Sequence, residues 1–303
     1  MLYTTNYVNI YTIIMQIHKP SRHAFNTKLY LGLLVLIALS IFGLYQYQNE
    51  QNKITDQLQA KISVELKKSS ELVYKTAKKR EPVFITLPGA QTIRAIVDDY
   101  SVTSSIWALV SKTSSISTDY VPSGLKIPDV ATRTDKSDDE RSVRSDIEQP
   151  LQDMFAAANG AGNQLMIGSG YRSAALQQTY LNSLAANIGL DAANQSIALP
   201  GQSEHQTGLA VDISTVSRNC YLDTCFGDTN DGLWLVHNSY KFGFILRYPS
   251  DKVSITGYKY EPWHFRYVGI DLATALHDSG LTLDEAWPYL QAADDTLRSN
   301  GAI

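Results

Sequence analysis

The chain has 303 residues, of which 44% are hydrophobic and 18% are charged, and its formal net charge is −4. This length accommodates one sizeable domain with additional segments, and the composition is that of a globular protein. The mildly negative charge argues against nucleic-acid binding, because nucleic-acid-binding proteins usually concentrate positive charge on one face.

The N-terminal part of the chain predicts a membrane anchor. Leu29 to Tyr45 is a nearly unbroken apolar run without a charge, which is the length of a short membrane-spanning helix or of a long signal-peptide core. Basic residues precede the run and acids follow it, so the N-terminus is expected in the cytoplasm and the rest of the chain outside. Because no small-residue cleavage site follows, an uncleaved anchor is favoured over a cleaved signal, and a buried core helix is the least favoured reading.

The region after the apolar run reads as a helical stalk. Ile54, Leu58, Ile62 and Leu66 recur at every fourth position, which places them on one face of a helix. This helix could be a spacer, a coiled-coil surface or an element packed on the following domain, and the spacer is the simplest reading. The expected division of the chain is a cytoplasmic segment at 1–28, a transmembrane signal-anchor at 29–46, a stalk or helical region at 47–104, and a catalytic domain at 105–303.

Beyond residue 105, short strands and helices follow one another. Ser173 can cap a helix that Gly189 ends, and Thr282 with Glu285 forms a capping box for the last helix. Apolar and aromatic runs predict strands at 165–170, 209–213, 244–248 and 258–268.

The only two cysteines, Cys220 and Cys225, lie in a predicted irregular loop. Their neighbours offer little for a metal site, so the alternatives are a disulfide that closes a small loop and two free thiols. The disulfide is favoured if the domain is exported from the cytoplasm.

Two short stretches far apart in the chain carry residues that could hold a metal ion. His205 and Asp212 lie in the first, and Glu261 and His264 in the second. A catalytic zinc ion takes three protein ligands and keeps one position open, and a nearby carboxylate can then serve as general base. Each residue alone has an ordinary structural reading, such as a hydrogen-bonded histidine or a capping aspartate, so spacing alone leaves both readings open.

These stretches resemble the motifs of the zinc D-alanyl-D-alanine carboxypeptidases of the VanY type, which are LAS metallopeptidases. That family carries Ser-x-His-x-x-Gly-x-Ala-x-Asp followed by Glu-Pro-Trp-His-Phe, and both patterns are complete here, at 203–212 and 261–265. An upstream element, Ser-Gly-Tyr-Arg-Ser at 169–173 with Gln177 beyond it, and the segment 241–249 also resemble the family. The similarity covers about residues 106–283.

The resemblance implies a fold and a set of roles. The fold would be α+β, with a small central antiparallel sheet flanked by helices and preceded by the transmembrane helix. A zinc ion (Zn2+) would be held by His205, Asp212 and His264, and Glu261 would be the general base. Arg172 would stabilise the charge that develops on the carbonyl oxygen. Contacts with the substrate are expected from three side chains: Arg172, Gln177 and Ser203.

The activity implied by the resemblance is hydrolysis of the C-terminal D-Ala from peptidoglycan stem peptides by a metal-activated water. The enzyme would be anchored in the cell membrane by a single span, with its catalytic domain outside. An L,D-carboxypeptidase or a peptidoglycan endopeptidase of the same family would use the same motifs, so these alternatives stay open. A cell-wall-binding protein on a degenerate peptidase fold would lack a ligand or the base, and none is missing. The sequence leaves protein partners open, including whether residues 52–100 bind one.

Overall fold

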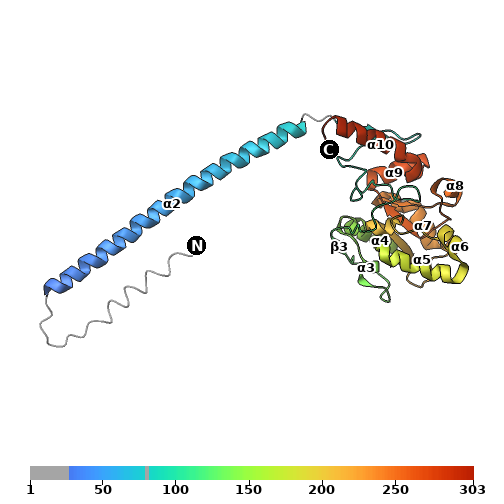
Figure 1. The fold of residues 1–303 in the computed structure, drawn as a ribbon, viewed down its shortest axis with the longest axis horizontal. Coiled ribbons are helices and arrows are strands. Elements are labelled where there is room, and N and C mark those ends of the chain that lie inside the picture. The colour runs from blue at the N-terminus through green and yellow to red at the C-terminus, as the bar shows by residue number, and fades with distance from the viewer. Residues whose placement is uncertain (1–26, 79–81) are drawn as a thin grey trace. The chain divides into compact units, whose positions relative to one another are not determined.

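The computed structural model of the chain describes residues 27–78 and 82–303 (Figure 1). The predicted cytoplasmic segment, residues 1–28, lies outside the described residues except for its last two. The described chain forms two units, a single long helix and a compact unit that follows it. The elements are α2 (Thr27–Lys78), β1 (Phe84–Ile85), β2 (Ile93–Arg94), β3 (Leu125–Lys126), α3 (Asp138–Arg141), β4 (Val143–Arg144), α4 (Glu148–Gly160), β5 (Leu165–Ser169), α5 (Ala174–Ile188), α6 (Leu190–Ser196), β6 (Ala210–Thr215), α7 (Asn230–Asn238), β7 (Phe244–Leu246), α8 (Val253–Thr256), β8 (His264–Tyr267), α9 (Ile270–Ser279) and α10 (Leu283–Ser299).

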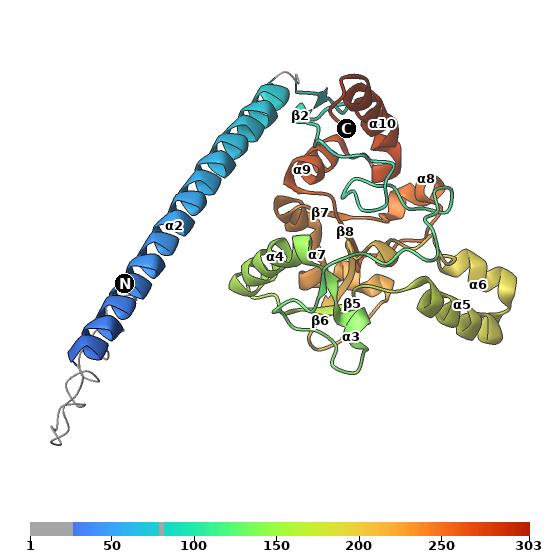
Figure 2. The ribbon, with the colours of Figure 1, turned by 60° about the vertical axis from the view of Figure 1, so that its left-hand side comes forward.

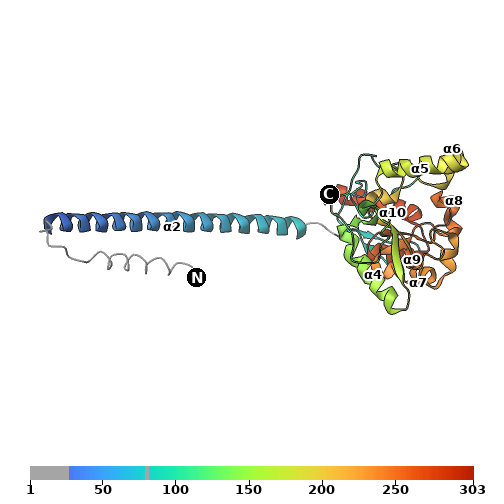
Figure 3. The ribbon, with the colours of Figure 1, turned by 90° about the horizontal axis from the view of Figure 1, so that it is seen from below.

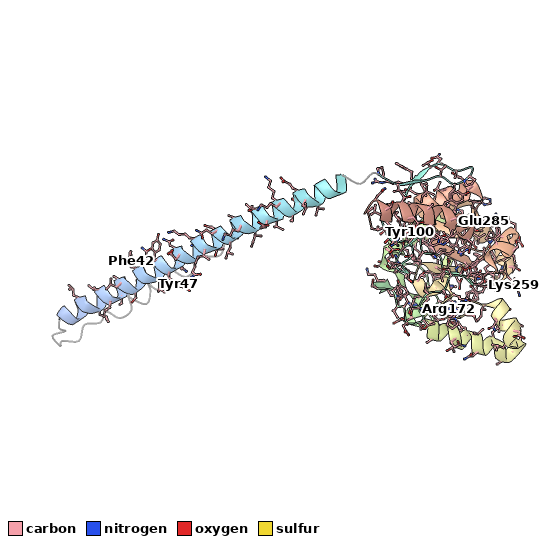
Figure 4. The ribbon with its side chains drawn as sticks, turned by 45° about the horizontal axis from the view of Figure 1, so that its top comes forward. Phe42, Tyr47, Tyr100, Arg172, Lys259 and Glu285 are labelled. Atoms are coloured by element: carbon pink, nitrogen blue, oxygen red, sulfur yellow. A yellow bond between two sulfur atoms is a disulfide. The ribbon has the colours of Figure 1, made fainter. Side chains whose placement is uncertain are left out.

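Helix α2 unites two segments that the sequence analysis treats separately, the apolar run and the stalk. It is 52 residues long, and the residues between the two segments, 46–51, include neither proline nor glycine, so nothing there ends the helix. An 18-residue window in this helix has a mean hydropathy of 1.6, so by length and composition the helix could cross a membrane. The side chains of Phe42 and Tyr47 project outward from it (Figure 4). The apolar stripe from Ile54 to Leu66 is also exposed within the described chain.

The compact unit is organised around a four-stranded antiparallel sheet with the order β5-β6-β8-β7. Side chains alternate between the two faces of a strand, and this alternation gives the sheet one apolar and one polar face. Val211 and Ile213 of β6 and Phe265 of β8 pack in a core with residues of α4 and α7. Asp212 and His264 therefore lie on the opposite face. The predicted α+β fold with a small antiparallel sheet is confirmed.

A second core joins the N-terminal part of the compact unit to the last two helices. It contains Ile85, Leu87 and Tyr100 together with residues of α9 and α10. The indole N–H of Trp107 donates to the carbonyl of Val268 at 2.8 Å and anchors this segment to the end of β8. The compact unit thus includes residues from 82 onward, whereas the sequence analysis assigned residues up to 104 to the stalk region. Residues 82–104 contain only the two short strands β1 and β2, so no long periodic pattern predicts their packing against α9 and α10.

Helices α5 and α6 lie together at one edge of the compact unit, away from α4 and α7 (Figures 2 and 3). The side chain of Ser173 accepts a hydrogen bond from the backbone N–H of Leu176, and Gly189 follows the last residue of α5, as the capping pattern predicts. The predicted capping box of α10 is also formed, between Thr282 and Glu285. Helix α5 therefore begins two residues after Arg172, at the edge of the sheet.

A disulfide joins Cys220 and Cys225 in the loop after β6, with a sequence separation of 5. A cross-link of this loop size stabilises a fold by restricting the unfolded chain, by about 2 kcal/mol. We expect the double variant Cys220→Ser/Cys225→Ser to lose about that much free energy of unfolding in denaturant titrations. Addition of a reductant should lower the stability of the wild type to the same level and leave the variant unchanged. Equal stability of variant and oxidised wild type would show that the bond contributes nothing.

Candidate active site

The register of the sheet brings two of the candidate ligands together. Asp212 of β6 is the direct partner of His264 of β8, and directly opposed residues of an antiparallel pair share one face of a sheet. His205 reaches the same place from a short 3₁₀ helix, Glu204–Thr207, that precedes β6. Gly208 links that helix to the strand with φ = 70°, a conformation that favours glycine.

Three buried side chains meet on this polar face. The Nε2 atom of His205 lies 3.3 Å from Oδ2 of Asp212, and the Nδ1 atom of His264 lies 3.3 Å from Oδ1 of the same carboxylate. One ligand atom from each of the three residues lies within 4.8 Å of the others. The structure thus brings together the three residues that the sequence analysis named as metal ligands.

A backbone carbonyl fixes the tautomer of His205. The Nδ1 atom of this residue lies 2.7 Å from the carbonyl oxygen of Gly170. Because a carbonyl can only accept, Nδ1 carries the proton and Nε2 presents its lone pair to Asp212. A Cβ atom on Gly170 would come within 2.2 Å of the carbonyl oxygen of Ser142, so only glycine lets the backbone pass this closely.

The donor set fits a zinc ion. Two imidazoles and one carboxylate, all buried, are a ligand set that zinc accepts. Burial opposes ionisation of Asp212, yet His205 and His264 hold the pKa of this carboxyl well below its ordinary value. Its Oδ1 atom is buried and has no hydrogen-bond partner among the described residues. An ionised carboxylate that lies between two imidazole nitrogens and has one oxygen without a hydrogen bond suits a cation.

Glu261 reaches the same place through a turn. The sequence analysis predicts one strand over 258–268, but β8 begins only at His264. Pro262 has no N–H to donate to a ladder, and the backbone N–H of His264 instead donates to the carbonyl of Glu261 at 3.1 Å. This turn leaves a Glu261 carboxylate oxygen 3.7 Å from Nδ1 of His264. Burial, with a further contribution from the negative charge of Asp212, raises the pKa of Glu261 to about 7.

Arg172 lies just before α5 (Figure 4). Its guanidinium faces the carboxylate of Asp212. Its Nη2 atom is 3.6 Å from Oδ2 of Asp212 and also donates to the hydroxyl of Ser169 at 3.1 Å. The guanidinium stacks over the ring of Tyr180, with 5.1 Å between its central carbon and the ring centroid. The guanidinium is therefore held from several sides at the edge of the metal-ligand cluster.

Gln177 and Ser203, which are also predicted to contact the substrate, differ in their hydrogen bonds to the rest of the protein. The side-chain oxygen of Gln177 accepts from Arg172 at 3.0 Å, and its amide nitrogen donates to the carbonyl of Ala198 at 2.7 Å. Gln177 thus connects Arg172 to the segment after α6. The hydroxyl of Ser203 makes no hydrogen bond within the described chain and lines the same cavity.

All the predicted catalytic, ligand and substrate-contact residues line one cavity of about 240 Å³. The walls of this cavity are completed by further residues: Ser196, Ile197, Ala198, Glu204, Leu222, Tyr248, Tyr258 and Trp263. The cysteines themselves do not line it, but Leu222 of their disulfide loop does.

The model of the VanY family, described as D-alanyl-D-alanine carboxypeptidase, matches residues 140–270. The protein YodJ of Bacillus subtilis (strain 168) is 44% identical over 181 residues, which are 60% of this chain and 66% of YodJ. A solved structure of the LD-carboxypeptidase LdcB is 43% identical with a TM-score of 0.59, covering 62% of this chain and 87% of LdcB. A mutant of the D,D-pentapeptidase VanY from the VanB-type vancomycin resistance cassette, in complex with Zn(II), is 35% identical with a TM-score of 0.50, covering 61% of this chain and 98% of that one.

The chain belongs to the VanY family. The predicted fold and family are therefore confirmed. The chain spans about half to two thirds of the length of the curated relatives that it first matches. The match to the VanY family model contains the Ser203–Asp212 and Glu261–Phe265 motifs, and the cavity described above is built mainly from the matched segment.

The structure adds an ionic cluster beneath this VanY-type site that the sequence analysis did not find. Glu204 is fully buried, and one of its oxygens accepts from Arg247 and from Arg266, at 2.8 Å each. Burial opposes its ionisation, but the two guanidinium groups hold the pKa of Glu204 well below its ordinary value. A signal existed in the sequence, because two arginines in apolar strands require a buried acid as partner.

Proposed function

We propose that this protein is a membrane-anchored zinc peptidase that removes the C-terminal D-Ala from peptidoglycan stem peptides. The proposal rests on one observation. His205, Asp212 and His264 present their ligand atoms within 4.8 Å of one another, in a cavity that also receives Glu261 and Arg172. The zinc complex of the VanY structure and the membership of the VanY family support it.

His205, Asp212 and His264 would hold the zinc ion. A zinc ion bound there supplies Lewis acidity, which lowers the pKa of water and polarises the carbonyl of the scissile bond. Glu261 accepts the proton of the attacking water and returns it to the leaving amine, and its raised pKa of about 7 suits both transfers near neutral pH. The Arg172 guanidinium, fixed in advance by Gln177 and Ser169, stabilises the negative charge that develops on the carbonyl oxygen.

Two bonds compete as the preferred site of cleavage. The VanY structure is described as a D,D-pentapeptidase, which favours release of D-Ala from a pentapeptide. The LdcB structure is described as an LD-carboxypeptidase and has the higher identity and TM-score of the two, which favours release of D-Ala from a tetrapeptide. Both reactions use the same ligands, base and arginine, so the walls of the cavity decide between them.

The location follows from the same proposal. Helix α2 can cross a membrane by length and composition, and the positive charges that precede it in the sequence favour a cytoplasmic N-terminus. The compact unit would then lie on the outer side, where peptidoglycan is. A disulfide between Cys220 and Cys225 agrees with an oxidising compartment.

The full-length protein, purified in detergent and loaded with zinc, should be incubated separately with a stem pentapeptide and a stem tetrapeptide, with products identified by mass. We expect loss of one alanine from the pentapeptide, and no loss with Glu261→Ala. Cleavage of the tetrapeptide in preference to the pentapeptide would instead establish the L,D activity. Release of alanine from neither peptide by the folded, zinc-loaded protein would overturn both carboxypeptidase assignments.

A further inference from the structure

Glu204 precedes His205 directly, but its side chain takes no part in the ligand cluster around Asp212. It lies beneath His264, and its side chain is 0% exposed. Its two oxygen atoms have different surroundings. Oε1 receives Nε of Arg247 and Nη1 of Arg266, whereas Oε2 has no hydrogen-bond partner among the described residues and lies 3.5 Å from Nε2 of His264.

The two arginines are fixed independently of His264. The Nη2 atom of Arg266 donates to the backbone carbonyls of Ile106 and Ala108, and Nη1 of Arg247 donates to the carboxylate of Asp284. These contacts hold both guanidinium groups in place, and the guanidinium groups in turn hold Oε1 of Glu204. The direction in which Oε2 points is therefore set by the protein scaffold.

This arrangement bears on which nitrogen of His264 is protonated. A carboxylate oxygen can only accept, so a ring nitrogen that faces a carboxylate is favoured as the protonated one unless a metal ion takes its lone pair. Nε2 of His264 faces Glu204, and Nδ1 faces the carboxylates of Asp212 and Glu261. A metal ion bound beside Asp212 would take the lone pair of Nδ1, and the proton of the neutral ring would then stay on Nε2, toward Glu204.

We infer that Glu204 is a positioning residue, which sets the tautomer and the ring orientation of His264 and thereby the zinc affinity of the site. The Glu204 side chain is 0% exposed and lies against Nε2 of His264, so it would act through that ring. Carboxylates that accept from the second nitrogen of a ligand histidine commonly alter metal affinity about 10- to 100-fold. The alternative is a purely structural role, in which Glu204 only compensates the charge of two buried arginines. Loss of Glu204 would leave two buried guanidinium groups uncompensated, so both roles predict a loss of stability, and zinc affinity is the property that separates them.

This inference rests on the proposed zinc site, and the experiment keeps the two apart. Zinc binding by the full-length wild type, Glu204→Gln and Asp284→Asn would be measured by competition with a chromophoric chelator. Melting of the zinc-free proteins would be followed in parallel. Asp284→Asn is the matched control, because it disturbs the same arginine but has no contact with His264. We expect Glu204→Gln to raise the zinc Kd about 10- to 100-fold, and Asp284→Asn to leave it within about twofold.

Each outcome has one meaning. A wild type that binds no zinc refutes the proposed metal site. A wild type that binds zinc while Glu204→Gln binds it equally well, even with a lowered melting temperature, overturns the role of Glu204 and leaves the site standing. If Glu204→Gln does not fold, Glu204→Asp replaces it, because it keeps the charge that the arginines need but withdraws the carboxylate from His264, and the same loss of affinity is expected.

A spectroscopic measurement needs no variant. In the zinc-loaded wild type, ring nitrogen chemical shifts of His264 should show Nδ1 as the ligand and Nε2 protonated, with a proton that exchanges slowly because the ring is buried. Zinc bound through Nε2 would contradict the inference directly, since Glu204 would then face the wrong nitrogen.

Discussion

Replacing Glu261 by glutamine is expected to lower kcat about a hundred- to ten-thousand-fold while zinc binding is retained. An amide of the same size cannot accept the proton of the attacking water, and loss of a general base typically has an effect of this size. The three proposed ligands are untouched, so the bound metal should stay near one zinc per chain. The assay is release of alanine from the stem peptide that the wild type cleaves, with zinc content measured by elemental analysis of the same samples.

The matched control for this experiment is Glu148→Gln. Glu148 is also a partly buried glutamate, but its carboxylate pairs with Lys126 and does not line the cavity. Its removal should change kcat by less than about twofold, in keeping with the small contribution of exposed ion pairs. If Glu261→Gln kept more than about a tenth of the wild-type kcat, another group would have to move the proton, and the assignment of Glu261 would be wrong.

Replacing His205 by alanine should abolish the metal site itself. One of the three proposed ligands disappears, while Asp212 remains buried next to His264. We expect zinc content to fall below about a tenth of the wild-type level, and activity to fall at least about a thousand-fold. The second figure follows because the metal supplies several kcal/mol of transition-state stabilisation.

His237→Ala is the control variant, because it removes an imidazole that does not line the cavity. His237 is exposed on α7, where its Nδ1 contacts only the carbonyl of Leu233, and it does not line the cavity. Zinc content and activity should both match the wild type. Full zinc content in His205→Ala would show that the ion binds elsewhere, for example through Glu261, and the ligand set would need to be redrawn.

The motif residues were predictable because their chemistry is local. An aspartate within an apolar strand needs a partner, and a Gly-Leu-Ala-Val-Asp run already indicates a buried strand whose carboxylate faces one side. The helix that starts after Ser173 and the capping box of α10 were likewise readable, since capping uses residues only three positions apart.

The remaining parts depend on contacts between distant residues. Glu204 forms ion pairs with Arg247 and Arg266, which lie 43 and 62 residues further along the chain. No local sequence pattern predicts which acid will pair with which arginine. The group that orients His205 is the backbone carbonyl of Gly170. A backbone contact of this kind cannot be predicted from the pattern of side chains in the sequence. Residues 82–104 join the core through a few apolar side chains separated by turns, so their place in the compact unit emerges only from tertiary packing.

The continuity of α2 sets the distance between the apolar run and the end of the helix at Lys78. An α-helix rises 1.5 Å per residue, so the part of α2 beyond the apolar run, residues 46–78, is about 50 Å long. A flexible chain of the same number of residues would have a mean extension of roughly 30 Å and would sample every height down to the lipid surface. A continuous helix instead has a fixed end-to-end length. If its apolar half is embedded in a bilayer, the helix ends at Lys78 at a fixed distance from the embedded end, and inserting or deleting turns of α2 would change that distance in steps of about 5.4 Å.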